Sequence, residues 1–250
     1  MRNILLRDLP RDAYAEIEPL FQGRAFDRAE RLHGPGEPIH DLYFPLDCLV
    51  SITVTMSDGR TAETGVVGSR EVVGINAFMG GRETTQTEYV IQIPGDAIRV
   101  PAAPLLRLFD RHKGVRDVLL KYTQAMLAQL TQNAACNALH SLEQRYARWL
   151  LEARDRIMSD ELRLTQEFIS QMLGVRRAGV SEVAHSFEAL GAVSQSRGRT
   201  RIVDGGRLEA ASCECYRVLA NEYDRLLGTG AVEAVLASLA RTAAPNPVLL

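Results

Sequence analysis

The sequence lacks any apolar run that approaches the roughly 20 residues needed to span a lipid bilayer. Its first residues carry Arg7 and Asp8 and do not contain the apolar core of a signal peptide. Both absences argue against a membrane anchor and against export. We therefore expect a cytoplasmic protein with no membrane partner.

Cysteine is also scarce, and its four positions are scattered along the chain at Cys48, Cys136, Cys213 and Cys215. With no export signal, disulfide bonds are not expected. The Cys-x-Cys pair at 213 and 215 has no partners elsewhere at a zinc-ligand spacing. We therefore expect ordinary helix residues, no metal site and no certain cofactor, with a redox or metal role as the alternative.

No nucleophile paired with a base, no phosphate-binding loop and no metal-ligating group can be recognised in one place, so we do not expect an enzyme. The net charge of −2 argues against a general polyanion binder, and the length of 250 residues allows two modest domains. Lysine is nearly absent, and the arginines gather locally: six lie between Val175 and Arg207, against three acidic residues. Such a patch can attract phosphate.

The pattern of the chain predicts an α+β protein. Residues 10–22 have helical spacing. Residues 29–101 alternate short β-rich runs with turn signals, of which Ser57-Asp58-Gly59-Arg60 is the clearest, and this is typical of a small antiparallel sandwich or barrel. Residues 139–157 form another helical run, with an apolar face at Leu142, Tyr146, Trp149 and Leu150.

Residues 104–135 contain no proline after Pro104 and a single glycine, and they predict a long helix with two apolar stripes. One stripe would cover the β-rich domain, and the other would pack on a second copy of the helix. The alternative is one wide stripe buried within the monomer. We assign dimerisation to the stripe formed by Val115, Leu119, Tyr122 and Met126; the other consists of Leu120, Leu127, Leu130 and Ala134.

Residues 164–203 predict a helix-turn-helix followed by a β-hairpin. Thr165 is a good helix N-cap, Gly174 is the turn residue, and a second helix starts near Arg176 and ends at Gly191. Its first turns would enter the major groove, where arginine can form a bidentate contact with guanine. The alternative is a helical hairpin with solvated arginines. The candidate DNA-contacting residues are Thr165, Gln166, Arg176, Arg177, Ser181, Arg197 and Arg199.

The runs HSLEQRYARWLL and LTQEFISQMLGVRRAGVSEVAHSFEALG resemble the Crp/Fnr family, the relatives of the cyclic-AMP receptor protein, and the likeness covers about residues 15–205. It implies a β-roll sensor domain (1–103), a dimerisation helix (104–136) and a winged helix-turn-helix domain (137–207). The residues past this likeness, 208–250, are expected to form a C-terminal helical extension. The likeness also implies that Thr165 and Gln166 touch phosphate, that Arg177 is the main base reader, and that Arg176 and Ser181 assist it. Ala178 and Glu182 depart from the prototype, so a different operator is expected. RNA polymerase is a further expected partner.

In cyclic-nucleotide-binding relatives, a Gly-Glu pair holds the ribose and an arginine about ten residues later pairs with the phosphate. Here Gly74 is followed by Ile75, and the arginine position falls near Thr85, with Arg82 close by. We therefore expect that cyclic AMP is not bound in the usual way and that the effector is unknown. The candidate effector-pocket residues are Gly74, Ile75, Asn76, Arg82, Thr84, Thr85 and Thr131.

No cysteine precedes Cys48, which disfavours the N-terminal iron–sulfur cluster of some relatives. Residues 208–241 form an amphipathic helical tail, with Leu236 and Leu239 in a further short helix, and we expect the tail to pack on the winged domain. The sequence thus predicts a homodimeric, sequence-specific DNA-binding regulator. The alternative is a small-molecule-sensing module that acts on a protein partner without DNA binding.

Overall fold

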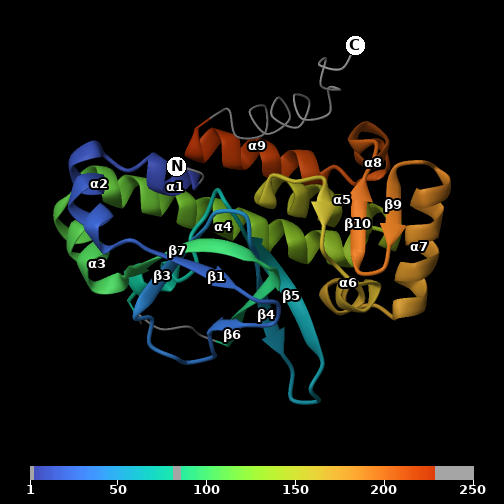
Figure 1. Ribbon diagram of the computed structural model, residues 1–250, viewed down its shortest axis with the longest axis horizontal. Helices are drawn as coiled ribbons and strands as arrows, with labels where there is room; N and C mark the ends of the chain where they lie inside the picture. Colours follow the sequence, from blue (N-terminus) through green and yellow to red (C-terminus); the bar gives the residue numbers. More distant parts are fainter. Residues whose placement is uncertain (1–2, 81–85, 229–250) are drawn as a thin grey trace, which may run out of the picture.

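The computed structural model describes residues 3–80 and 86–228 and is drawn in Figure 1. Its N-terminal part is a β-roll, which follows three short helical segments: α1 (Ile4–Arg7), α2 (Arg11–Ile17) and the 3-10 helix η1 (Glu18–Leu20). A long helix then runs alongside the roll and leads to a second domain of helices with a small sheet. The predicted α+β architecture is confirmed.

The β-roll consists of two antiparallel sheets, in the orders β1-β7-β3 and β2-β6-β4-β5. The predicted turn at 57–60 joins β4 to β5, and Gly59 adopts the left-handed conformation there (φ 83°). The 3-10 helix η2 (Ile75–Phe78) precedes β6. The strands are β1 (Gln22–Phe26), β2 (Arg31–His33), β3 (Asp41–Pro45), β4 (Leu49–Thr55), β5 (Thr61–Val67), β6 (Thr87–Ile93) and β7 (Gly95–Pro101).

The single helix predicted over 104–136 is in fact two helices, α3 (Ala102–Arg111) and α4 (Lys113–Leu139). They are separated at His112, whose backbone is extended (φ −110°, ψ 104°). The imidazole Nε2 of His112 lies 3.1 Å from a carboxylate oxygen of Asp12 on α2, and this contact anchors the break. The Arg116 guanidinium also donates hydrogen bonds to the carbonyls of Phe109 and Asp110, near the end of α3.

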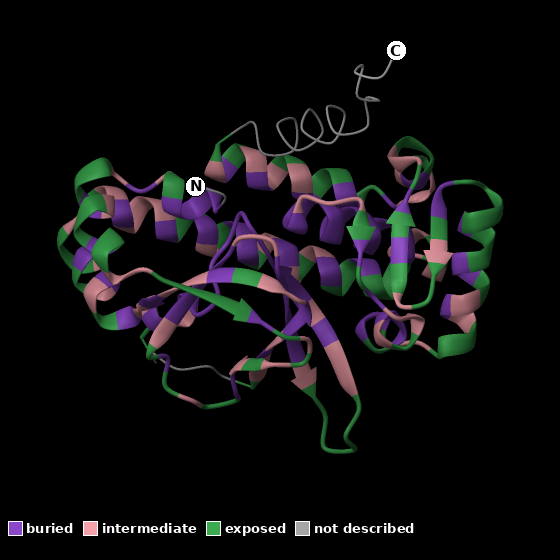
Figure 2. Cartoon of the chain, in the orientation of Figure 1, coloured by how far each residue is buried: buried purple, intermediate pink, exposed green. Residues whose placement is uncertain are grey.

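The assignment of dimerisation to Val115, Leu119, Tyr122 and Met126 is wrong, because these side chains are buried in the core of the β-roll. The Tyr122 hydroxyl, for example, donates a 3.0 Å hydrogen bond to the carbonyl of Val72. Three members of the second stripe are exposed, Leu120 (51%), Leu127 (58%) and Ala134, whereas the fourth, Leu130, is partly buried against the core of the β-roll. Figure 2 shows α4 with both buried and exposed residues along its length. Periodicity finds both stripes but cannot tell which one faces the roll.

The second domain contains three helices, α5 (Leu142–Ile157), α6 (Gln166–Leu173) and α7 (Arg177–Ala189), and a small sheet in the order β8-β10-β9. Ser141 begins α5 through a capping box with Gln144. The predicted hairpin is β9 (Val193–Ser196) and β10 (Arg199–Ile202). The third strand, β8 (Glu161–Leu162), was not predicted from the sequence, because two residues are too few to show a periodic pattern.

The C-terminal extension begins with α8 (Gly205–Ala211) and α9 (Cys215–Leu227). Helix α8 packs on α5, as expected, but α9 lies along α4 (Figure 1). Tyr223 and Leu226 cover Ala125 of α4, and Asp224 forms a 2.7 Å ion pair with Arg70 of the β-roll. The expectation that the tail packs on the winged domain is therefore only partly correct. The predicted helix at Leu236 and Leu239 lies outside the described residues.

Buried polar contacts join the β-roll to α5. The indole N–H of Trp149 donates a 2.8 Å hydrogen bond to the carboxylate of Glu63 on β5. Burial of Glu63 raises the pKa of its carboxyl group to about 7. The two domains therefore meet at a seam that includes an ionisable group.

A second set of contacts at the same seam centres on Arg156 of α5, whose guanidinium lies between two buried carboxylates. It is 3.1 Å from Glu71 of the β-roll and 3.4 Å from Glu152. Glu152 in turn pairs with Arg148 at 2.6 Å. The ring of Tyr223 on α9 lies 5.5 Å from the Arg156 guanidinium. This buried network, Glu71–Arg156–Glu152–Arg148, connects the β-roll, α5 and the C-terminal extension.

Within residues 3–80 and 86–228, no helix is both long and apolar enough to cross a membrane.

Candidate nucleic-acid interface

Helix α6 is positioned by the residues that the sequence singled out. The Thr165 hydroxyl oxygen accepts a 3.2 Å hydrogen bond from the Phe168 N–H, which confirms Thr165 as the N-cap. Gly174 adopts the left-handed conformation (φ 64°) that ends the helix. The predicted turn between α6 and α7 is thus present, and Gln166 stands at the first position of α6.

Helix α7 begins at Arg177, with Arg176 at its cap position, and is followed by Gly191 in the left-handed conformation (φ 68°). Its buried face holds Val180, Val183, Ala184 and Phe187, as the spacing predicts. Because these residues fix one side of α7 to the domain core, the opposite side is presented to solvent. The Arg177 side chain on that side is 67% exposed.

An open hollow, which we call the α7 groove, lies between the start of α6, the exposed side of α7 and the β9–β10 turn. It brings together four of the seven predicted DNA-contacting residues: Thr165, Gln166, Arg177 and Arg197. Ser181 adjoins them, since its hydroxyl donates a 2.6 Å hydrogen bond to the side-chain oxygen of Gln166. Ser181 therefore orients the Gln166 amide.

The two remaining predicted residues lie elsewhere. Arg176 lines a separate hollow beside the β4–β5 hairpin, together with Met56 and Arg60. Arg199 belongs to β10 rather than to the turn, and its guanidinium forms a 2.7 Å ion pair with Glu161 of β8. Because both partners are exposed, the Arg199–Glu161 pair is weak and leaves the guanidinium accessible.

The other lining residues of the α7 groove were not predicted to contact DNA: Leu164, Glu167, His185, Glu188, Gln195, Ser196 and Gly198. His185 follows Ser181 by four residues and therefore lies on the same side of α7, a signal that was available in the sequence. Gln195 is held in place because its backbone N–H donates a 2.9 Å hydrogen bond to the Glu188 carboxylate of α7. This bond fixes the hairpin against α7.

The Arg177 guanidinium forms only a weak ion pair within the protein, so it can exchange that partner for DNA. The nearest carboxylate recorded for it is Glu167, whose Oε2 lies 3.9 Å from Nε of Arg177, and both side chains are mostly exposed. Solvent-exposed pairs of this kind contribute about 0–1 kcal/mol. A phosphate or a guanine edge that offers two acceptors would therefore compete well with Glu167.

The candidate effector pocket is only partly described, since Arg82, Thr84 and Thr85 lie outside the described residues. Gly74 has φ 95°, and a Cβ atom there would lie 2.9 Å from the Leu42 side chain. Ile75 is buried in the core, and Asn76 accepts a 3.1 Å hydrogen bond from the Tyr89 hydroxyl. Thr131 is exposed on α4, and its hydroxyl donates to the carbonyl of Leu127.

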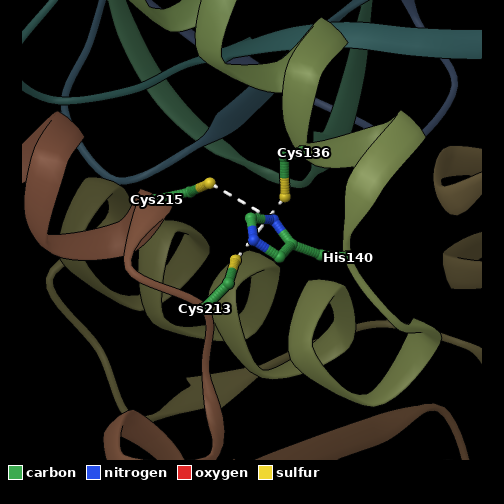
Figure 3. Close-up of side chains that lie close together, drawn as sticks. All are labelled: Cys136, His140, Cys213 and Cys215. Atoms are coloured by element: carbon green, nitrogen blue, oxygen red, sulfur yellow. Dashed lines mark hydrogen bonds between the residues drawn. The ribbon is translucent and has the colours of Figure 1, made fainter.

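The expectation that the cysteines are scattered, without partners for the Cys-x-Cys pair, is contradicted by the structure. Cys136, Cys213 and Cys215 meet in one buried cluster with His140 (Figure 3). The hydrogen bond from the Cys213 thiol lowers the pKa of the Cys136 thiol to about 5, against the effect of burial. Sequence spacing could not show this, because residues 141–212 lie between His140 and Cys213.

The fold and the α7 groove together define a class: a β-roll joined through a long helix to a winged helix-turn-helix domain. Residues 23–112 match the family model described as a cyclic nucleotide-binding domain. Residues 144–211 match the model described as a Crp-like helix-turn-helix domain. With these two domains in this order, the chain belongs to the Crp/Fnr family of transcriptional regulators, as its sequence suggested.

Solved structures of other proteins share this fold. FixK2 from Bradyrhizobium japonicum is 18% identical, with a TM-score of 0.66 over 77% of this chain and 98% of its own. A protein from Eubacterium rectale assigned to the crp/fnr family is 19% identical, with a TM-score of 0.63 over 83% and 96%. The c-di-GMP-responsive regulator CLP from Xanthomonas campestris is 17% identical, with a TM-score of 0.60 over 77% and 99%. No curated protein sequence matches the chain significantly.

Proposed function

We propose that this protein is a sequence-specific DNA-binding regulator that acts as a homodimer, with α7 of each copy in the major groove. The observation that carries the proposal is the α7 groove, where exposed Arg177 stands between the start of α6 and Arg197 of the hairpin turn. In this arrangement Arg177 reads bases, while Thr165, Gln166 and Arg197 bind phosphate. RNA polymerase remains the expected further partner.

The homodimer would form through the exposed stripe of α4. Leu120, Leu127 and Ala134 are seven residues apart and exposed, which is the spacing of a helix that packs against a parallel copy. A two-fold dimer would present two α7 helices to half-sites one helical turn, about 34 Å, or a multiple of this distance apart. The operator should therefore be an inverted repeat.

The direct test begins with selection of bound duplexes from a random pool, followed by gel-shift titration of the selected DNA. We expect Arg177→Ala to weaken binding to the selected duplex roughly 30-fold or more, since each dimer loses two bidentate contacts of about 1–3 kcal/mol each. Binding to unrelated duplexes should change much less. Arg225→Ala, which removes an exposed arginine of α9, is the matched control and should bind normally.

Two outcomes would count against this function. One is selection that enriches no sequence; the other is an Arg177→Ala protein that binds the selected duplex as tightly as the original. Either result would favour the second candidate, a small-molecule-sensing module that acts on a protein partner without DNA binding.

We further propose that the β-roll does not bind cyclic AMP in the usual way. Ile75 replaces the ribose-binding carboxylate that the family pattern implies, and it is buried in the core. Charge-assisted hydrogen bonds are worth roughly 1.5–3 kcal/mol each, so losing the carboxylate and the phosphate-binding arginine would weaken binding more than about a hundredfold. Isothermal titration should therefore detect no micromolar binding of cyclic AMP. A micromolar dissociation constant would overturn this part of the proposal.

A further inference from the structure

Four side chains from two distant parts of the chain point toward one another at the C-terminal end of α4 (Figure 3). Cys136 and His140 lie one turn apart at the C-terminal end of α4, where the backbone N–H of His140 bonds to the carbonyl of Cys136. Cys213 and Cys215 come from the turn between α8 and α9. All three sulfur atoms belong to buried residues, and the His140 side chain is mostly buried.

The spacing of the donor atoms fits one tetrahedral ion. The Sγ atoms of Cys136 and Cys213 are 3.5 Å apart, and Sγ of Cys215 is 3.5 Å from Nδ1 of His140. With Zn–S of about 2.3 Å and Zn–N of about 2.0–2.1 Å, a tetrahedral site has S···S and S···N edges of about 3.8 and 3.6 Å. The four donor atoms all lie within 4.8 Å of one another, which leaves room for a single ion.

We propose that Cys136, His140, Cys213 and Cys215 bind one Zn²⁺ ion as a closed structural site. Three thiolates and one imidazole are a standard donor set for structural zinc. These four ligands fill all four positions of a tetrahedral ion, so none is left for water or substrate. All three cysteines bind as thiolates, so any thiol proton still present leaves to solvent on binding; the neutral imidazole donates the Nδ1 lone pair, and the metal remains divalent. This assignment replaces the sequence-based expectation of no metal site.

Two neighbouring polar side chains, Glu214 and Gln132, orient His140 and Cys215 as metal ligands. Nε2 of His140 lies 3.3 Å from the Glu214 carboxylate, so its N–H can donate there while Nδ1 faces the sulfur atoms. A carboxylate on the outer nitrogen is the usual partner of a zinc-binding histidine. The side-chain amide of Gln132 donates a 3.0 Å hydrogen bond to Sγ of Cys215, which suits a thiolate. Both partners fix the ligand orientation.

The consequence of the site is the attachment of the C-terminal extension to the dimerisation helix. Two ligands lie at the C-terminal end of α4, Cys213 lies in the turn before α9, and Cys215 is the first residue of α9. The ion would therefore clamp the start of α9 onto the end of α4, next to the first residues of α5. A bound metal would also stabilise the folded state, because the unfolded chain does not hold the four donors together. The proposal is independent of DNA binding.

The test uses full-length protein purified without chelator and analysed by mass spectrometry for metals. We expect one zinc per chain, lost in Cys213→Ala and Cys215→Ala. Cys48→Ala removes the buried cysteine outside the cluster and should retain one zinc. Glu214→Gln should keep the ligands but weaken zinc binding roughly 10–100-fold in chelator competition. Circular dichroism checks that each variant is folded.

A second readout covers the case in which a cysteine variant does not fold. Reduced, metal-free original protein is titrated with Co²⁺, which should give the absorption of a tetrahedral thiolate site at one equivalent and be displaced by Zn²⁺. The proposal is overturned if the original protein binds neither ion stoichiometrically, if Cys48→Ala abolishes binding as the other variants do, or if Cys136 and Cys213 are found joined as a disulfide in metal-free protein.

Discussion

Replacing Arg156 with alanine should lower the free energy of unfolding by about 3–5 kcal/mol, because it leaves the buried Glu71 carboxylate without its charged partner and Glu152 with Arg148 alone. Arg156 lies between Glu71, which is 1% exposed, and Glu152, which is 4% exposed. Both carboxylates are nearly inaccessible to solvent in the folded protein, so an unpaired charge there is poorly hydrated. Urea denaturation at neutral pH, followed by far-UV circular dichroism, measures the change.

A matched control for this prediction is Arg60→Ala, which breaks an exposed pair with Asp58 in the β4–β5 turn. Exposed pairs contribute about 0–1 kcal/mol, so the control should unfold close to the original protein. If Arg156→Ala cost no more than Arg60→Ala, the buried network could not be what holds the two domains together.

Introducing glutamate at Leu127 should convert the protein to a monomer and abolish its binding to a selected operator. Leu127 is 58% exposed, so the change should leave the fold of the monomer intact. In a two-fold dimer the substitution occurs twice. Each copy would bury one Leu127 side chain in the dimer interface, and losing both costs about 1.5–3 kcal/mol each. The dimer dissociation constant should therefore rise at least about 100-fold, and repulsion between the two carboxylates adds to this effect. Sedimentation velocity and gel shifts on the same samples measure both effects.

Val218→Glu on α9 is the control, because it also places a carboxylate at an exposed apolar position on a helix. It should remain dimeric and bind the operator. A Leu127→Glu protein that sediments as the original does would show that the exposed stripe of α4 is not the dimer contact, and the surface that joins two copies would have to lie elsewhere.

Much of the winged domain could be predicted from local sequence because local chemistry determines it. Thr165 begins α6 by accepting a hydrogen bond three residues ahead, and Gly174 and Gly191 end helices in a conformation that suits glycine. The buried face of α7 follows from the spacing of its apolar residues. Four of the proposed DNA-contacting residues consequently lie in one groove as expected.

The errors concern contacts between residues far apart in the chain. The two stripes of α4 are similar in sequence, and only the packing of the β-roll decides that Val115 and Leu119 are buried while Leu127 is exposed. At the break between α3 and α4, His112 contacts Asp12, which lies 100 positions earlier in the chain. The cysteine cluster likewise requires α9 to return to the end of α4, which no local pattern encodes.

The chain contains a single tryptophan, Trp149, and it sits at the seam between the two domains with its indole N–H bonded to Glu63. Its fluorescence therefore comes from one known place. A shift in emission upon addition of a small molecule or a duplex would report a rearrangement of the β-roll against α5, without any label. Candidate effectors can thus be screened optically on the unmodified protein.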